Sequence, residues 1–153
     1  MTGEPFSIDT IARWSDMDGN AHMANSAYLD VVVEARLAFF EAHGFPASEF
    51  ARLKLGPIVV EDTIQYFAEV RLRERLRVTL ALLGSTRDGA RFRLRNEIHR
   101  GDGRIAARVT SHGAWFDLER RKIVEPPPAL RNAMDQLHRS ADFAVMTSTA
   151  PEP

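Results

Sequence analysis

The sequence contains no cysteine among its 153 residues. Disulfide scaffolds, thiol nucleophiles and cysteine-based zinc sites are therefore excluded together, and any chemistry must come from carboxylate, imidazole, hydroxyl or backbone groups. The chain also lacks an apolar run close to the roughly 18 residues that a membrane span needs. Its first residues, MTGEPFSIDT, have neither the basic start nor the apolar stretch of a signal peptide. These absences favour a cytoplasmic protein.

What the sequence does contain is 44% hydrophobic residues and no repeat or low-complexity block, which is enough to bury one core. The net charge of −1 is unevenly distributed: residues 1–70 carry 4 basic and 11 acidic side chains, and residues 71–108 carry 11 arginines against 4 acids. Such a segment in a near-neutral protein indicates a local anion site rather than general attraction to nucleic acid. We expect residues 1–153 to form a single domain, with an ordered core over about 6–139 and a flexible C-terminal tail over about 141–153.

A long helix is predicted for residues 26–43, SAYLDVVVEARLAFFEAH, where acidic residues mark one thin polar stripe at helical spacing. This pattern is typical of a helix of about five turns that is buried on most of its circumference. Asn25 or Ser26 can cap its start, and Gly44 followed by Phe45-Pro46 can end it.

Period-two alternation after Gly56 predicts a series of strands separated by turn signals. The expected strands cover about 7–13, 58–72, 73–82, 91–99 and 104–118, and a short helix covers about 129–139. Consecutive strands joined by tight turns are antiparallel. One largely apolar helix followed by such a meander predicts an α+β fold in which the sheet wraps around the helix.

The segment 13–28, RWSDMDGNAHMANSAY, places an unusual number of polar side chains just before the long helix: Asp16, Asp18, Asn20, His22 and Asn25. The first backbone N–H groups of a helix are unpaired and carry about half a positive charge. They can stabilise an oxyanion that forms on a carbonyl group, while a nearby carboxylate attacks that carbonyl or deprotonates a water molecule. The loop therefore indicates acyl-transfer chemistry.

These residues, together with Glu-Ala-Arg at 34–36, resemble the signature of hotdog-fold acyl-CoA thioesterases similar to 4-hydroxybenzoyl-CoA thioesterase, including the interval from Asp18 to Tyr28. The resemblance implies a hotdog fold with Asp18 as the catalytic carboxylate. We expect Asn25 and His22 to be further catalytic-site residues that position water, the substrate or the loop. It implies that the helix-start amides polarise the thioester carbonyl, which here are those of Met23, Ala24 and Asn25. It also implies a homodimer or homotetramer with active sites at the subunit interface, no metal, and no cofactor other than the coenzyme A of the substrate.

The loop departs from the family pattern at two positions. Ala21 stands where a glycine is usual, and Ala24 replaces the first of two paired asparagines. In both exchanges one small residue replaces another, so we expect the turn to be kept. The exchange at Ala24 is expected to remove one polar contact to the substrate. Asp16 is expected to be a structural hydrogen-bond acceptor, and His22 to orient the loop or contact substrate. The five histidines show no ligand spacing typical of a metal site.

Two rows of arginines are expected to face each other across the hairpin that turns at 85–89: Arg71, Arg73, Arg75 and Arg77 against Arg91, Arg93 and Arg95. Opposed like charges destabilise a hairpin, so an anion or a partner's carboxylates would relieve the cost. Coenzyme A phosphates and an acidic acyl-carrier protein both fit this role. We predict four substrate-binding residues: Tyr28, Tyr66, Arg91 and Arg93.

The predicted function is hydrolysis of an acyl-CoA or acyl-carrier-protein thioester to a carboxylic acid and a free thiol, with Asp18 as base or nucleophile. Two alternatives remain. Asp18-Gly-Asn20-Ala21-His22 partly matches the Asp-x-Asn-Pro-x-His loop of hotdog enoyl-CoA hydratases but lacks the proline. A non-catalytic acyl-CoA-binding hotdog module would keep the pocket without the reaction.

Overall fold

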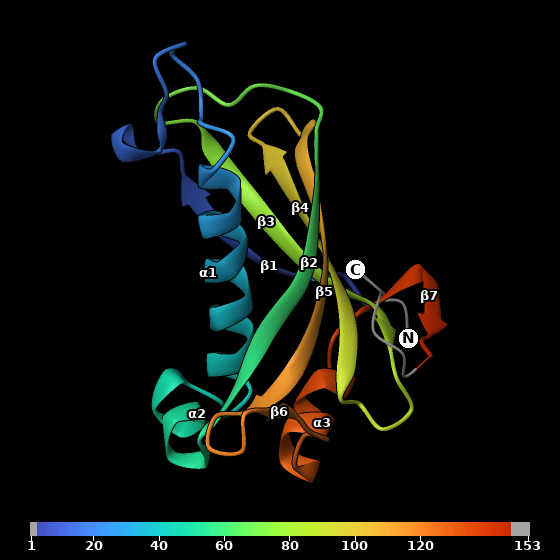
Figure 1. Cartoon of the computed structure of the whole chain (residues 1–153). Coiled ribbons are helices and arrows are strands. Elements are labelled where there is room, and N and C mark those ends of the chain that lie inside the picture. The colour runs from blue at the N-terminus through green and yellow to red at the C-terminus, as the bar shows by residue number, and fades with distance from the viewer. Residues whose placement is uncertain (1–2, 148–153) are drawn as a thin grey trace.

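One curled sheet packed against one long helix forms the body of the molecule. The computed structural model describes residues 3–147. Its elements are β1 (Phe6–Ile11), a 3-10 turn (Trp14–Asp16), α1 (Ala27–Ala42), α2 (Ala47–Leu53), β2 (Leu55–Tyr66), β3 (Arg75–Ser85), β4 (Arg91–Arg100), β5 (Ile105–Asp117), β6 (Lys122–Ile123), α3 (Pro128–Asp135) and β7 (Arg139–Val145). The strand order is β1-β3-β4-β5-β2, with β6 beside β5 and β7 beside β3 (Figure 1). The predicted α+β class, with a sheet curled around a central helix, is confirmed.

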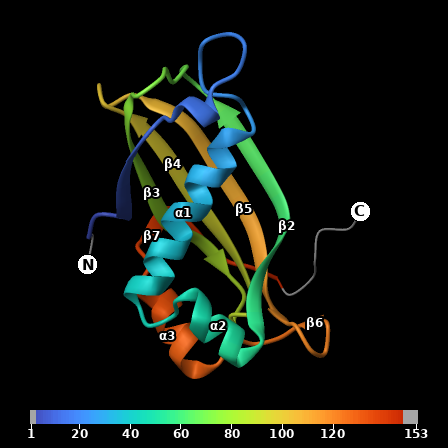
Figure 2. The same ribbon diagram turned by 90° about the vertical axis from the view of Figure 1, so that its left-hand side faces the viewer.

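Helix α1 lies lengthwise on the concave face of the sheet (Figure 2). Its observed bounds confirm the helix predicted for 26–43. The sheet covers one side only, so Val33 and Leu37 on the other side are 44% and 48% exposed. The predicted burial over most of the circumference is therefore wrong for a single chain. In residues 3–147, no helix is both long and apolar enough to cross a membrane.

Strands β3, β4 and β5 form the predicted antiparallel meander. The strand predicted over 58–72 is wrong at its end, because β2 stops at Tyr66 and the segment 67–74 crosses the end of the sheet to reach β3 (Figure 1). Strand β2 pairs with β5 and not with the strand that follows it. The reason is that the two edges of β3 are already used by β1 and β4.

The two rows of arginines predicted to face each other across the hairpin are not formed. Arg71 and Arg73 lie in the segment before β3, and the hairpin register places Arg95 opposite Ala81 and Arg77 opposite His99. Carboxylates of the same chain pair with three of these arginines: Arg71 with Glu69 at 3.0 Å, Arg77 with Asp9 at 3.0 Å and Arg95 with Asp142 at 3.1 Å. The chain thus supplies counter-charges for part of the two rows, whereas Arg73, Arg75, Arg91 and Arg93 have no ion-pair partner within residues 3–147.

The C-terminal part of the described chain is more ordered than expected. Residues 139–145 form β7, which runs parallel to β3 and places the Asp142 carboxylate against Arg95. The loose tail predicted over 141–153 is therefore wrong for its first residues, and its remainder from 148 lies outside the described residues, as do residues 1–2. Helix α3 begins at the predicted place but ends at Asp135. Helix α2 and strand β6 are additions that the sequence pattern missed.

Two strands of the sheet approach closely at Gly113, on β5. A Cβ atom at this position would lie 2.7 Å from the Phe92 ring and 2.9 Å from the Ile58 carbonyl oxygen. We expect Gly113→Ala to lower the free energy of unfolding by about 2 kcal/mol, because the ring and the strand must move apart. Urea denaturation measures this. Gly56→Ala is the matched control, since nothing lies within 4 Å of its Cβ, and an equal loss in both variants would contradict the steric explanation.

Candidate active site

Asp16 holds the loop between β1 and α1 in place through hydrogen bonds. This side chain is buried, and its carboxylate accepts a hydrogen bond of 2.8 Å from the Arg13 amide and lies 3.4 Å from the Arg13 guanidinium. The Asp16 carbonyl accepts the amide of Ala24 at 2.8 Å. These bonds fasten the loop to the start of the helix, which is the structural role predicted for Asp16.

Asp18 lies on a small hairpin that the Met17–Met23 bridge closes. Its amide donates to the His22 carbonyl at 2.9 Å, and its Oδ1 accepts the Asn20 amide at 2.8 Å. The other oxygen, Oδ2, lies 3.4 Å from Nδ1 of His22, and the Asp18 side chain is 28% exposed. The carboxylate is thus held in one orientation while it remains accessible, which suits a base or a nucleophile.

Ala21 adopts φ = 63° at the turn of this hairpin. This is the left-handed region, which a glycine enters freely and an alanine enters at a cost of about 1 kcal/mol. The departure from the family's glycine therefore falls at a position where the backbone itself favours glycine. The turn is nevertheless kept, as expected, and it brings His22 back beside Asp18.

The start of α1 leaves backbone donors free. Ser26 occupies the N-cap position without a side-chain capping bond, so the predicted cap by Asn25 or Ser26 is not formed. The amides of Met23 and Ala24 are used by the carbonyls of Val70, at 2.7 Å, and Asp16, at 2.8 Å. Among the backbone bonds of residues 3–147, none uses the amide of Asn25 or Ser26. Of the three amides predicted for an oxyanion, Asn25 is the one that remains available.

Two tyrosines meet beside these free amides. Tyr28, on the first turn of α1, is 3% exposed, and its ring packs edge to face against Tyr66 with centroids 5.2 Å apart. The Tyr66 hydroxyl donates to the Asn25 carbonyl at 3.0 Å. Strand β2 therefore reaches the helix start through Tyr66, and both predicted substrate-binding tyrosines lie next to the loop of Asp18.

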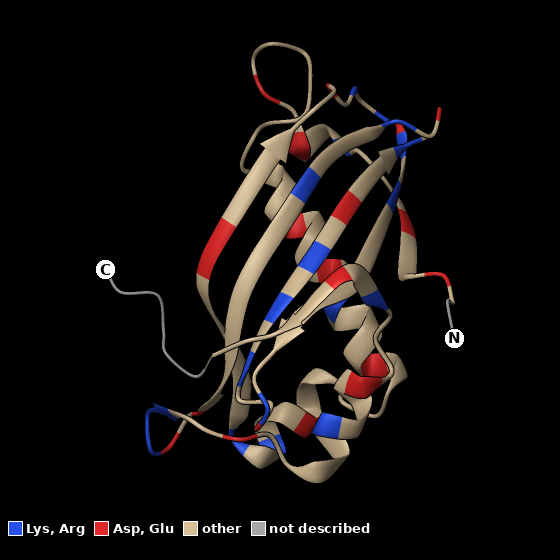
Figure 3. Cartoon of the chain, turned by 90° about the vertical axis from the view of Figure 1, so that its right-hand side faces the viewer, with Lys and Arg blue, Asp and Glu red and all other residues tan. Residues whose placement is uncertain are grey.

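Arg91 and Arg93 lie far from this site within one chain. Their neighbours Phe92 and Leu94 pack in the core with residues of α1, so the alternation along β4 turns the two arginines to the opposite face of the strand. Figure 3 views the sheet from the side opposite to α1, with basic positions along its strands in blue. Arg93 pairs across the sheet with His112, whereas Tyr66 pairs with Ala107. Burial lowers the pKa of His112, and Arg91 and Arg93 lower it further. The structure therefore separates these two arginines from Asp18.

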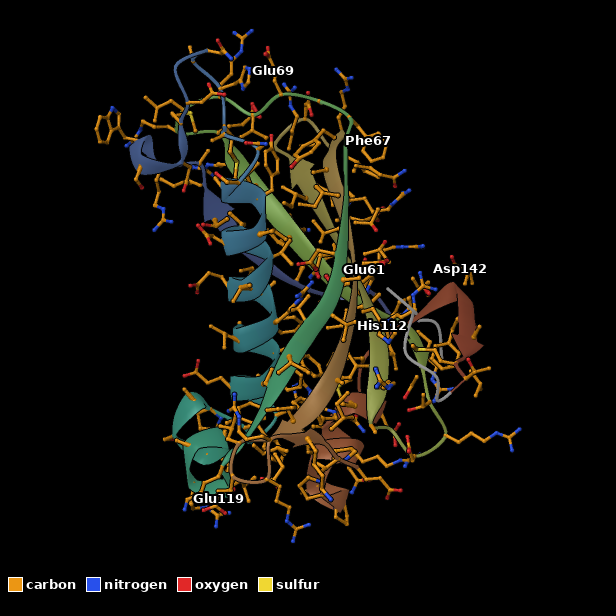
Figure 4. The ribbon with its side chains drawn as sticks, in the orientation of Figure 1. Glu61, Phe67, Glu69, His112, Glu119 and Asp142 are labelled. Atoms are coloured by element: carbon orange, nitrogen blue, oxygen red, sulfur yellow. The ribbon has the colours of Figure 1, made fainter. Side chains whose placement is uncertain are left out.

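The segment 67–74 contributes to the site although the sequence pattern placed it in a strand. The Val70 carbonyl holds the Met23 amide, and Val70 itself is fully buried. Figure 4 shows Glu69 at the end of the molecule that carries the loop before α1. No local signal marks this segment as part of the site, because its apolar residues continue the alternation of β2. Within residues 3–147, no three acidic or histidine side chains gather in a way that could hold a metal ion.

Comparison with known proteins identifies the family. The sequence model of the thioesterase-like superfamily matches residues 12–134. The chain belongs to this superfamily. The matched region runs from the start of the Asp18 loop into α3, so this thioesterase-like domain includes the whole sheet except β1 and β7.

A curated relative of the thioesterase-like domain is the L-carnitine dehydrogenase/betainyl-CoA thioesterase of Agrobacterium fabrum. It is 33% identical over 122 residues, which cover 80% of this chain and 25% of the relative. The chain thus spans a quarter of the length of that protein.

Solved structures share the fold at lower identity. A Staphylococcus aureus protein in complex with CoA is 20% identical, with a TM-score of 0.81 over 99% of this chain and 92% of that one. The 1,4-dihydroxy-2-naphthoyl-CoA thioesterase of Synechocystis is also 20% identical, with a TM-score of 0.78 over 88% of this chain and 98% of that one. At this identity the similarity shows the hotdog fold.

Proposed function

We propose that the protein hydrolyses acyl-CoA thioesters to a carboxylic acid and free coenzyme A. The observation that carries this proposal is the accessible carboxylate of Asp18 beside an uncapped helix start, in a chain of the thioesterase-like superfamily. A helix start that lacks a side-chain cap is less stable by about 1 kcal/mol. The donors that it leaves free are those that a thioester carbonyl needs.

In the proposed reaction the thioester carbonyl oxygen accepts the Asn25 amide, which stabilises the negative charge that develops on it. Asp18 then acts in one of two ways. As a base it removes a proton from water, and the hydroxide adds to the carbonyl carbon and expels the thiolate. As a nucleophile it attacks the carbonyl carbon and breaks the C–S bond, so that the coenzyme A thiolate leaves and a mixed anhydride of Asp18 and the acyl group forms. Water then hydrolyses this anhydride to the carboxylic acid and the free Asp18 carboxylate. His22 and Asn25 position the loop and the substrate in both versions.

Thiol release from a panel of acyl-CoAs tests the proposal. Because the chain has no cysteine, a thiol reagent reports coenzyme A alone. The panel includes the acyl groups named for relatives, betainyl and 1,4-dihydroxy-2-naphthoyl, and straight chains of several lengths. Loss of enoyl-CoA absorbance without thiol release would favour the hydratase alternative. Tight binding of acyl-CoA without turnover would favour the binding module.

We propose further that a second copy of the chain completes the assembly, as a homodimer or homotetramer. Strand β2 lies at the end of the sheet order, and its Val59 and Val60 are 55% and 42% exposed. The exposed side of α1 adds Val33 and Leu37. Long apolar edge strands are normally covered. Light scattering is expected to give at least twice the 17.2 kDa mass of one chain, and Val60→Lys is expected to shift the protein towards monomer.

Arg91 and Arg93 remain proposed substrate contacts only for a substrate held by another copy, because they face away from α1 in their own chain. An acyl-carrier protein remains the other proposed thioester donor. The cytoplasmic location stays a prediction.

A further inference from the structure

A side chain from the edge strand of the sheet holds the start of α1. Tyr66, the last residue of β2, donates a hydrogen bond from its hydroxyl to the Asn25 carbonyl at 3.0 Å. The first helical residue, Ala27, follows two positions later. The bond therefore joins the sheet to the peptide group between Asn25 and Ser26, which leads into the helix.

Several contacts fix the position of the Tyr66 hydroxyl. Strand pairing places Tyr66 opposite Ala107 on β5, and the amide of the next residue, Phe67, donates to the Ala106 carbonyl at 2.8 Å. Figure 4 shows Phe67 at the upper end of β2. The Tyr66 ring packs edge to face on the buried Tyr28, with centroids 5.2 Å apart. The hydroxyl is thus held both by the sheet and by the first turn of α1.

A hydrogen bond to a carbonyl leaves the amides of the helix start free. A side-chain cap would satisfy these amides, and they would no longer be available to a substrate oxygen. Ser26 is the N-cap residue, and its side chain makes no capping bond. Within residues 3–147, no backbone carbonyl accepts the amide of Asn25 or Ser26. Tyr66 therefore restrains this helix start without using its donors.

The hydrogen bond from Tyr66 acts on the Ser26 amide, because the Asn25 carbonyl and the Ser26 N–H belong to one peptide group. None of the peptide bonds within residues 3–147 is cis. The Ser26 N–H therefore points opposite to the Asn25 carbonyl and away from the Tyr66 hydroxyl. A hydrogen bond accepted by the carbonyl also polarises the peptide group, which strengthens its N–H as a donor by about 10–30%.

We propose that Tyr66 is a positioning residue of the oxyanion site and that it makes the Ser26 amide a second donor beside that of Asn25. The inference rests on the proposed thioesterase function and deepens it. Two adjacent amides at the positive end of the helix dipole would share the charge that develops on the thioester oxygen. This role requires the Tyr66 hydroxyl, whereas the substrate contact predicted for Tyr66 requires only its ring.

Tyr66→Phe removes the hydroxyl and keeps the ring. We expect kcat for thiol release to fall about tenfold, less than the roughly 10²–10³-fold loss for a deleted oxyanion donor, because the Ser26 amide remains but is no longer aligned. KM is expected to change less than about twofold, since a developing charge depends more on an aligned donor than a neutral carbonyl does.

A substrate analogue without a carbonyl separates positioning from binding. The alkyl-CoA thioether of the same chain length is expected to bind the wild type and Tyr66→Phe with equal Kd by calorimetry. Ser140→Ala is the matched control, because its hydroxyl also donates to a backbone carbonyl, that of Leu82, at 3.3 Å, but on β7. Its kcat is expected to stay within about twofold of the wild type.

Hydrogen exchange of the amides at residues 27–31 tests the restraint without any substrate. Tyr66→Phe is expected to speed this exchange about fivefold, the factor that corresponds to one net hydrogen bond, because the helix start then opens more easily. Ser140→Ala is expected to leave it unchanged. Circular dichroism confirms that each variant is folded.

The possible results separate the inference from the function on which it rests. An unchanged kcat in Tyr66→Phe overturns the positioning role and leaves the thioesterase proposal intact. A higher Kd for the thioether with unchanged kcat would show that Tyr66 only contacts the substrate. Unchanged hydrogen exchange would contradict the restraint of the helix start. Failure of the wild type to release thiol from any acyl-CoA overturns the thioesterase proposal, and the role of Tyr66 with it.

Discussion

Asp18→Asn is expected to lower kcat for thioester hydrolysis by about 10³-fold or more, because the amide can neither deprotonate water nor attack the carbonyl carbon. The substitution keeps the side-chain oxygen that accepts the Asn20 amide, so the hairpin should hold its shape. KM is expected to change little for a neutral acyl group, since the carboxylate acts on the reaction more than on binding. Initial rates of thiol release measure both parameters.

Asp30→Asn is the matched control for Asp18→Asn. Asp30 is an exposed carboxylate on the first turn of α1, and its removal changes the charge near the helix start by the same amount. We expect its kcat to stay within about twofold of the wild type, as for most exposed substitutions. Wild-type rates in Asp18→Asn would refute the proposed mechanism. Equal losses in both variants would show a general charge effect in place of a role in the reaction.

Arg36→Met is expected to lower the free energy of unfolding by about 3 kcal/mol. The Arg36 guanidinium crosses from α1 to the sheet, where it donates to Oδ1 of Asn96 at 3.0 and 3.1 Å and to the Ser111 hydroxyl at 2.6 Å. The Ser111 hydroxyl in turn donates to Asp62. Asn96 is fully buried and Ser111 is 2% exposed, so methionine would leave their oxygens without a donor.

The midpoint of urea denaturation at constant slope measures this loss. Arg52→Met is the control, since Arg52 is an exposed arginine on α2 that pairs with Glu49 three residues earlier. Its loss of stability is expected to be clearly smaller than that of Arg36→Met, because solvent screens an exposed ion pair. Burial lowers the pKa of Arg36, an effect that Asp62 opposes. A loss no larger than that of Arg52→Met would show that the network adds little to stability.

Local patterns predicted the elements whose stability is local. Helix α1 was found because its apolar positions follow helical spacing, and the β3–β4 hairpin was found because Ser-Thr-Arg-Asp-Gly is a strong turn signal. The buried Asp16 and the hairpin of Asp18 also follow from short-range bonds, within four residues of each carboxylate. Such features depend on neighbours in the chain, which the sequence displays directly.

Elements that depend on contacts between distant parts of the chain were not predicted from local patterns. Strand β7 has little apolar alternation, and it exists because β3 offers it a free edge near its end. The end of β2 was missed because Val70 and Leu72 continue the period-two pattern. Val70 is indeed buried, but it lies in a loop and not in a strand. The predicted pairing of the two arginine rows was wrong for a related reason. The strand register depends on where the turn begins, and this position was not known from the sequence.

The sequence by itself determined the family resemblance, the long helix and the crowded polar loop that precedes it, because each of these is encoded in residues close together along the chain. The tertiary structure alone decided which helix-start amide stays free. The Val70 carbonyl, from a distant segment, takes the Met23 amide, and the Tyr66 hydroxyl reaches the Asn25 carbonyl across 41 positions of sequence. Hydrogen bonds of this kind depend on the packing of segments that no local pattern relates, so only the folded chain shows them.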